Sequence, residues 1–158
     1  MSFDAEKIEI RRLSETDLEQ VVRIADALTE APHWSRKLYE EALRSDGPPP
    51  RVALVAQDPD SGEVTGFAIA SLIPPEAELE SIAVDARVQR RSVGRRLFAA
   101  LAAELQEAGV QELLLEVRAS NLTAIRFYTA QNFKQTGTRS RYYADPQEDA
   151  VLMALRLV

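Results

Sequence analysis

One segment, Ser81 to Phe98, constrains the fold most, because it predicts a strand, a short turn and a helix in direct succession. Ser81–Val84 is typical of the end of a buried strand. The helix is indicated by apolar residues at helical spacing, namely Leu97, Phe98, Leu101 and Leu105. The segment therefore predicts a strand–turn–helix unit.

The turn of this unit, Gln89 to Gly94, is rich in arginine. Arg90 and Arg91 lie within it, and Arg95 follows just inside the helix. Backbone N–H groups at a helix start have no intrahelical partner, and the helix dipole makes that end positive. Such an end suits anions, and added arginines suit phosphate in particular. The sequence therefore predicts a pyrophosphate site and, with it, a nucleotide-bearing cofactor.

Composition excludes several classes of site. The chain has 158 residues, which fits a single domain spanning 1–158. It has no cysteine, so a disulfide framework, a thiolate metal site and a cysteine nucleophile are excluded. The single histidine, His33, excludes sites built on a pair of histidines. We expect no metal.

Charge and hydropathy indicate the compartment and the class of partner. The net charge of −6 disfavours nucleic acid and is compatible with a cationic amine or a basic peptide. No apolar run reaches the roughly 18 residues of a membrane span, and the first residues lack the apolar core of a signal peptide. We expect a cytoplasmic protein without membrane contact, as a monomer or weak dimer.

Periodicity and turn residues predict the order β-α-α-β-β-β-α-β-α-β-β, which indicates one mixed α/β domain. Strands are expected at 7–13, Arg51–Gln57, Val64–Ile73, Glu78–Val84, Val110–Val117, Phe133–Arg139 and Val151–Val158. Helices are expected after a capping box at Thr16 and Glu19, over 36–45 after Ser35, over about Val93–Ala108 before a C′ Gly109, and over 122–131 after Ser120 or Asn121.

Together these segments resemble the GNAT superfamily of acyl-CoA-dependent N-acetyltransferases. Gln89 to Gly94 stands in the register of that superfamily's pyrophosphate turn, [RQ]-x-x-G-x-[GA], after a strand and opening a helix. The stretches LEVRASNLTAIRFYTAQNF and RSRYYADPQEDAVLMALRL are similar to the ribosomal-protein-alanine N-acetyltransferases of the RimI type. The resemblance runs over essentially the whole chain.

The resemblance implies a single GNAT-like domain of the α/β (α+β) class. Its sheet would be mixed and mostly antiparallel, of about seven strands with about four flanking helices, and its fourth and fifth strands would splay apart. It also implies acetyl-CoA as co-substrate. The cofactor-binding residues implied are Ile82, Ala83, Val84, Gln89, Arg90, Arg91, Ser92, Val93, Gly94, Arg95, Asn121 and Tyr128.

Two positions depart from the family pattern. Ser92 replaces the first glycine of the turn, and it would weaken the turn by about 1 kcal/mol if the site needs a positive φ. Asn132 replaces a glycine before Phe133, where asparagine is expected to keep a left-handed helix C-cap.

Two residues are candidates for acid–base chemistry. The resemblance implies that Glu116 is the base for the acceptor amine, directly or through a water; an ion pair with Arg118 or another arginine is the alternative. It implies that Tyr128 is the acid that protonates the leaving thiolate, and packing on the inner face of its helix is the alternative. A backbone N–H near Val84 would stabilise the oxyanion. Asn121 would contact the pantetheine or simply cap its helix.

Acceptor-binding candidates come from three segments. Tyr142 and Tyr143 are expected in a loop between the last two strands, where the resemblance implies a peptide groove. Glu78 and Glu80 are candidates to bind a positively charged N-terminus, or else form a solvated sheet face. Trp34, next to His33, either lines the edge of the acceptor site or is a hydrophobic staple.

The resemblance implies acetylation of the α-amino group of a protein N-terminus, with a ribosomal protein starting with Ala or Ser as the expected substrate. Two alternatives stay open. The same fold could acetylate a small amine or an amino acid, because a fold does not fix a substrate. A CoA-binding regulatory module with little catalysis is the other.

Overall fold

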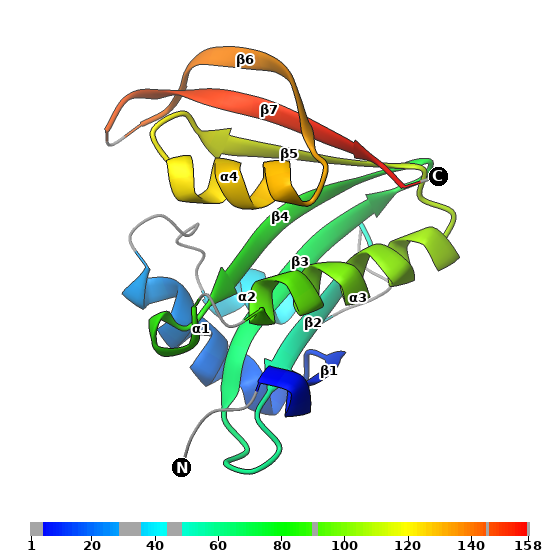
Figure 1. Ribbon diagram of the computed structural model, residues 1–158, viewed down its shortest axis with the longest axis vertical. Coiled ribbons are helices and arrows are strands. Elements are labelled where there is room, and N and C mark those ends of the chain that lie inside the picture. Colours follow the sequence, from blue (N-terminus) through cyan, green and yellow to red (C-terminus); the bar gives the residue numbers. More distant parts are fainter. Residues whose placement is uncertain (1–4, 29–35, 44–48, 90–91, 145, 158) are drawn as a thin grey trace.

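A computed structural model describes residues 5–28, 36–43, 49–89, 92–144 and 146–157. They form one seven-stranded sheet in the order β1-β2-β3-β4-β5-β7-β6, with β4 and β5 parallel and all other neighbours antiparallel. This mixed, mostly antiparallel α/β architecture confirms the predicted fold class (Figure 1). In these described ranges, no helix is long and apolar enough to cross a membrane.

The strands are β1 Glu9–Arg12, β2 Arg51–Gln57, β3 Val64–Ile73, β4 Glu76–Val84, β5 Glu112–Arg118, β6 Lys134–Tyr143 and β7 Glu148–Arg156. The α-helices are α1 Leu18–Ala27, α2 Arg36–Ala42, α3 Val93–Glu107 and α4 Leu122–Ala130. Short 3₁₀ turns occupy Ala5–Lys7, Glu15–Asp17 and Ala86–Val88.

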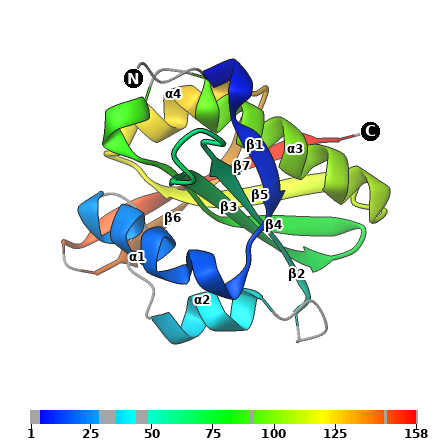
Figure 2. The same cartoon turned by 90° about the horizontal axis from the view of Figure 1, so that it is seen from below.

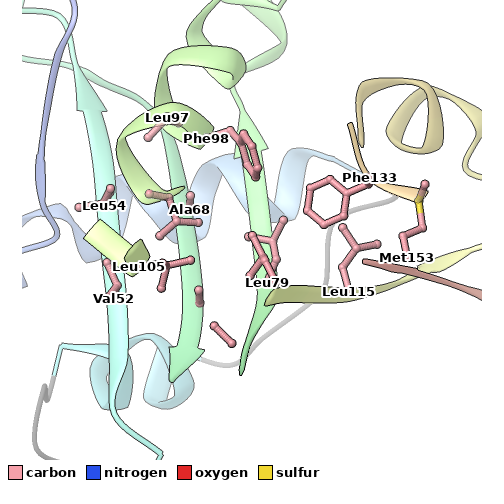
Figure 3. Close-up of a cluster of buried hydrophobic side chains, with 14 of the residues drawn as sticks. Val52, Leu54, Ala68, Leu79, Leu97, Phe98, Leu105, Leu115, Phe133 and Met153 are labelled. Atoms are coloured by element: carbon pink, nitrogen blue, oxygen red, sulfur yellow. The ribbon is translucent and has the colours of Figure 1, made fainter. Parts of the chain in front are cut away.

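Helices cover both faces of the sheet, so the protein has two hydrophobic cores. One core joins the sheet to α3 and α4, and there Phe98 of α3 packs on Phe133, with ring centroids 5.7 Å apart (Figure 3). The other joins the opposite face to α1 and α2, where Tyr39 meets Phe67 edge to face at 5.8 Å. Figure 2 shows α1 and α2 on the side of the sheet opposite α3 and α4.

The parallel strands β4 and β5 separate soon after they begin. Their ladder joins only Glu76–Glu78 to Glu112–Leu114, and beyond it the two strands diverge (Figure 1). The predicted splay of the fourth and fifth strands is therefore confirmed. The rest of β4 keeps a β neighbour on its β3 side alone, so the side facing β5 is open to another hydrogen-bonding partner.

Gly66 sets how closely α3 approaches the sheet. It lies opposite Val84 in the β3–β4 ladder. A Cβ there would lie 2.9 Å from the carbonyl oxygen of Ala83 and 3.0 Å from Leu97 of α3. Only glycine allows this contact, and the contact brings the start of α3 against the end of β4.

The first helix begins differently from the expectation. The predicted capping box at Thr16 and Glu19 is wrong: the N-cap is Ser14, and Asp17 is its partner. The Asp17 carboxylate accepts a hydrogen bond from the Ser14 backbone N–H at 2.8 Å and pairs with Arg11 at 2.7 Å. The Asp17 carboxylate thus has two partners, the Ser14 N–H within the turn and Arg11 on β1, whereas Glu19 has neither. As a result, a 3₁₀ turn over Glu15–Asp17 precedes α1.

Several strands differ from their expected limits; β7, for example, begins at Glu148, three residues earlier than predicted. β4 begins at Glu76, two residues earlier than predicted, and carries a bulge that leaves Glu80 between the pairs Ala70–Leu79 and Ile69–Ser81. β6 continues to Tyr143, so the expectation of a loop at Tyr142 and Tyr143 is wrong. Pairing of Tyr143 with Glu148 keeps this end of the strand in the sheet, past an irregularity after Arg139.

Candidate functional site

The predicted pyrophosphate turn meets α3 at Ser92. Ser92 is the N-cap and has a left-handed backbone, with φ of 68° and ψ of 7°. This is the positive φ that favours glycine, so serine is strained here. The Ser92 hydroxyl accepts a hydrogen bond from Arg95 at 3.3 Å, while Val93 is buried beneath the turn.

Of the described turn residues, Gly94 leaves room for close approach by an anion. Gly94 lies in the first turn of α3, where an added Cβ would lie 3.4 Å from Phe127 of α4. The start of α3 is thus next to α4, with no side chain on Gly94 to fill the space. Gln89 turns back and donates to the carbonyl oxygen of Val84 at 3.1 Å. Arg90 and Arg91 lie outside the described residues.

The end of β4 directs backbone groups toward the opening between β4 and β5. The N–H of Asp85 donates to Thr65 on β3 at 2.8 Å. Because backbone groups alternate along a strand, those of Val84 and Ile82 point the other way, toward the side that β5 has left. Ala83 is buried and its side chain joins the core under α1 and α2. These orientations suit the oxyanion role predicted for an N–H near Val84.

Both ends of α4 have the predicted caps. The side chain of Asn121 accepts a hydrogen bond from the N–H of Ala124 at 3.1 Å, which makes it the N-cap. Asn132 directly follows the C-cap Gln131, has a φ of 75° and donates its N–H to the carbonyl oxygen of Thr129, so it is the expected left-handed residue that ends the helix. The capping alternative for Asn121 is confirmed, and its contact with a cofactor stays a prediction.

Tyr128 lies on the inner face of α4, partly buried. Its ring packs edge to face on Phe127 and Phe133, with centroids 5.6 Å from each. Burial and the nearby Tyr143 raise the pKa of Tyr128 to about 12. The phenol therefore stays protonated throughout the physiological range and can donate a proton. Packing and a role as acid are compatible in this arrangement.

Glu116 lies on β5 just past the point where β4 and β5 separate. Its side chain is 24% exposed and pairs with Arg139 of β6 at 3.5 Å. Arg118, the partner considered from the sequence, is engaged elsewhere, with Glu148. The hydroxyl of Tyr142 donates a hydrogen bond to Glu116, and that bond raises the pKa of Tyr142. The Glu116 carboxylate therefore has Arg139 and the Tyr142 phenol as partners, and it stays partly exposed.

Tyr142 and Tyr143 stack edge to face with centroids 5.1 Å apart. Tyr142 is 47% exposed, and the guanidinium of Arg139 lies 5.1 Å from its ring centre. Burial and the charge of Glu116 raise the pKa of Tyr143 to about 12. Tyr143 also acts on the pKa of Tyr128, so it lies within electrostatic reach of both acid–base candidates.

The two glutamates of β4 have different surroundings. Glu80 pairs with Arg51 at 2.7 Å, with both side chains mostly buried, which matches a structural ion pair. Glu78 is near Glu116; burial, then the charges of Glu116 and Glu80, raise its pKa. Glu78 is therefore the better placed of the two to meet a cation, and a bound cation would relieve the repulsion there.

Three further residues belong to this region and were not predicted as site residues. Arg139 pairs with Glu116, Arg118 donates to the turn between β6 and β7, and Glu148 pairs with Arg118. Their only sequence signal is that Arg118 follows Glu116 by two, which places both on one face of a strand. Trp34 and His33 lie outside the described residues. Within the described parts of the chain, no group of three potential metal ligands gathers.

Comparison with known proteins identifies the family. The model of the acetyltransferase (GNAT) family matches residues 18–133. The chain is 39% identical over 150 residues to the [ribosomal protein bS18]-alanine N-acetyltransferase of Salmonella typhimurium, covering 90% of this chain and 93% of the relative. It is 44% identical over 97 residues to the Escherichia coli enzyme of that name, covering 60% of this chain and 66% of that protein, just under two thirds.

Structural comparison gives the same family. The crystal structure of the ribosomal-protein-S18-alanine N-acetyltransferase from Escherichia coli superposes with a TM-score of 0.79 and 35% identity. The match covers 95% of this chain and 94% of that one. The splayed strands, the left-handed turn at Ser92 and these matches lead to one conclusion: the chain belongs to the GNAT family of acetyltransferases, which take acetyl-CoA as donor.

Proposed function

We propose that this protein, acting as one N-acetyltransferase domain over 1–158, transfers the acetyl group of acetyl-CoA to the α-amino group of a protein N-terminus. The proposed acceptor is a ribosomal protein that begins with Ala or Ser. Relatives that carry the name bS18-alanine N-acetyltransferase align over up to 93% of their length and support this acceptor class.

One observation carries the proposal. The ring of Tyr143 packs on Tyr142 with centroids 5.1 Å apart, and it lies within electrostatic reach of both Glu116 on β5 and Tyr128 on α4, the candidate proton acceptor and donor. Glu116 lies two residues past the end of the β4–β5 ladder, and the backbone of Val84, six residues past it on β4, points toward the same opening. Attack on a thioester needs a base, an oxyanion donor and an acid together, and these three elements supply them.

The proposed reaction is direct attack in a ternary complex. A peptide α-amine has a pKa of about 7.7–8.0, so a carboxylate such as Glu116 suffices to take its proton, directly or through a water. The amine nitrogen then bonds to the thioester carbonyl carbon while the N–H of Val84 stabilises the charge on oxygen. Tyr128 donates its phenolic proton to the thiolate sulfur as the C–S bond breaks.

The residues around Glu116 suit a cationic chain start. Glu78 carries a carboxyl with a raised pKa beside Glu116, and the ring of Tyr142 is exposed next to them. An arriving α-ammonium would be attracted by the two carboxylates, and the following residues would lie against the tyrosine rings. A small amine would use the carboxylates but leave the exposed ring unoccupied.

Incubation with acetyl-CoA and a panel of short peptides that differ in their first residue tests the proposal. Mass spectrometry locates the acetyl group, and free small amines and lysine-containing peptides with blocked N-termini are the controls. We expect α-N-acetylation of peptides that start with Ala or Ser. Products from free small amines alone would support the alternative acceptor, and CoA binding without any product would support a regulatory module.

A further inference from the structure

We propose that Arg118 is a positioning residue that sets the acceptor-binding turn and joins it to the start of α4. This inference rests on the proposed function, because it assigns Tyr143 and its turn to the acceptor. Arg118 ends β5, two residues after Glu116, and is 29% exposed as a side chain. Its guanidinium is therefore largely withdrawn from water beside the proposed base.

The first set of contacts holds the turn between β6 and β7. Arg118 donates to the carbonyl oxygen of Ala144 at 3.1 Å and to that of Pro146 at 3.0 Å. The same guanidinium lies 4.5 Å from the centre of the Tyr143 ring. A planar cation with several donors can satisfy two carbonyls and stack on a ring at once, which a lysine cannot. One side chain thus fixes both the turn and the tyrosine.

The second set of contacts reaches the other side of the site. Glu148 of β7 pairs with Arg118 at 3.4 Å and accepts a hydrogen bond from the backbone N–H of Ser120 at 2.6 Å. These hydrogen bonds lower the pKa of Glu148, so the carboxylate stays charged. Ser120 directly precedes Asn121, the N-cap of α4. A continuous polar path therefore runs from the acceptor turn through Arg118 and Glu148 to the segment that carries the proposed cofactor contact.

This path makes a prediction that a general stabilising role does not. If Arg118 positions Tyr143, its loss should weaken acceptor binding selectively. The start of α3 is held by other contacts, and Asn121 keeps its own hydrogen bond from the Ala124 N–H, so the cofactor side should change little. If Arg118 only stabilises the fold, both substrates should be affected together. Comparison of the change in the acceptor KM with the change in the acetyl-CoA KM therefore decides between these roles.

The experiment compares four proteins: wild type, Arg118→Ala, Arg118→Lys and the control Arg12→Ala. Arg12 pairs with Glu104 at 3.0 Å on the β1 edge of the sheet, so its variant also removes an arginine ion pair, away from the site. KM for an accepted peptide and KM for acetyl-CoA are measured for each, with hydrogen exchange followed by mass spectrometry on the free proteins.

For Arg118→Ala we expect a rise of about tenfold in the acceptor KM and less than about twofold in the acetyl-CoA KM. Arg118→Lys keeps the charge and should recover only a minor part of the lost acceptor binding, because a lysine cannot donate to both carbonyl oxygens. Exchange should quicken in two separate segments, near Ser120 and over the β6–β7 turn. Arg12→Ala should leave both KM values unchanged.

Equal changes in the two KM values, or an acceptor KM within about twofold of wild type in a folded variant, would overturn the inference. If Arg118→Ala fails to fold, Arg118→Lys carries the same comparison. A wild-type protein that acetylates only small amines would contradict the proposed function instead. In that case, exchange confined to one of the two segments would still overturn the link through Glu148.

Discussion

Glu78 and Glu116 lie on neighbouring strands with their carboxyl groups close enough to interact. Burial, followed by the charge of Glu116, raises the pKa of Glu78 above its ordinary value of 4.5. Arg139, which pairs with Glu116 at 3.5 Å, offsets only part of this rise, so the two carboxylates still favour binding of a further cation or a proton. The arrangement is unfavourable for the free protein at neutral pH, and it suits a site that receives an α-ammonium.

The pH dependence of stability follows from this pair. The folded protein holds the Glu78 proton more tightly than the unfolded chain, so Glu78 lowers stability as pH rises from 4.5 through the raised pKa. Glu78→Gln should therefore unfold at a higher temperature than wild type at pH 7, with no difference below about pH 4. Because Glu78 keeps an exposed surface, screening limits the gain to less than about 1 kcal/mol. Thermal unfolding across pH measures it.

The same substitution should weaken acceptor binding while it stabilises the fold. A Glu78→Gln protein with a higher acceptor KM and an unchanged acetyl-CoA KM would agree with the proposed role. Among the described residues, Glu80 is the ion-pair partner of Arg51, so Glu80→Gln is the matched comparison. That variant leaves Arg51 without its partner and should lose stability at pH 7. A gain in stability from both substitutions would contradict the distinction between the two glutamates.

Gly66→Ala should destabilise the protein. The added methyl group would lie 2.9 Å from the backbone oxygen of Ala83, which cannot move away without disturbing the β3–β4 ladder. Overpacking of this kind costs about 1–3 kcal/mol. Gly137→Ala on β6 is the control, because its Cβ would have ordinary contact with Leu152 at 3.7 Å. Denaturant unfolding compares them, and equal effects would mean that the close approach of α3 has no special cost.

Ser92→Gly should stabilise the folded protein. Serine at a φ of 68° is already strained in the free protein, and glycine adopts this conformation freely. The expected gain in the free energy of unfolding is about 0.5–1 kcal/mol, since the greater freedom of glycine in the unfolded turn offsets part of it. Ser92→Ala keeps the strain and removes only the hydroxyl. Denaturant unfolding measures the relief of strain, and calorimetry with acetyl-CoA on Ser92→Ala measures what the hydroxyl adds to binding. A Ser92→Gly protein no more stable than wild type would show that the serine is not strained.

Local sequence signals predicted most of the elements and the caps. Gly109 and Asn132 both have the positive φ expected after helices, and the strand–turn–helix unit at Ser81–Phe98 is present, with a short 3₁₀ turn added. The cap at Ser14 was missed because Asp17, the partner of Ser14, is also held by Arg11 of the preceding strand. A capping-box pattern considers only residues within the helix start.

Long-range pairing could not be predicted from the same signals. β6 continues through Tyr143 because Glu148 pairs with it, although Ser140 and Arg141, just before the tyrosines, lack the alternation of a strand. Likewise, Glu116 proved to pair with Arg139, which lies 23 positions later in sequence. The sequence predicted that an arginine could pair with Glu116. Which arginine pairs with which carboxylate depends on strand register, and local patterns do not give the register.

Glu116→Gln should lower kcat by about 10²–10⁴ with near wild-type affinity for CoA, because it removes the proton acceptor and keeps the shape. The change also breaks the ion pair with Arg139. Arg139→Ala breaks the same pair while it leaves the carboxylate, and its kcat should fall less than about tenfold. Steady-state kinetics gives both values. A loss under about threefold for Glu116→Gln at every pH would reject the base and leave a structural ion pair.

Tyr128→Phe tests the acid by removing one oxygen. The ring contacts with Phe127 and Phe133 remain, so packing alone predicts little change in stability or rate. As acid, Tyr128 has a pKa of about 12, so its loss should slow departure of the thiolate across the whole assay range rather than above one pH. A thioester with a more acidic thiol should recover much of the rate, because its thiolate leaves without a proton. Single-turnover rates with acetyl-CoA and with that thioester measure both effects. Equal rates for variant and wild type with acetyl-CoA would leave Tyr128 as a core residue only, since a phenol that donates in the slow step cannot be removed without cost.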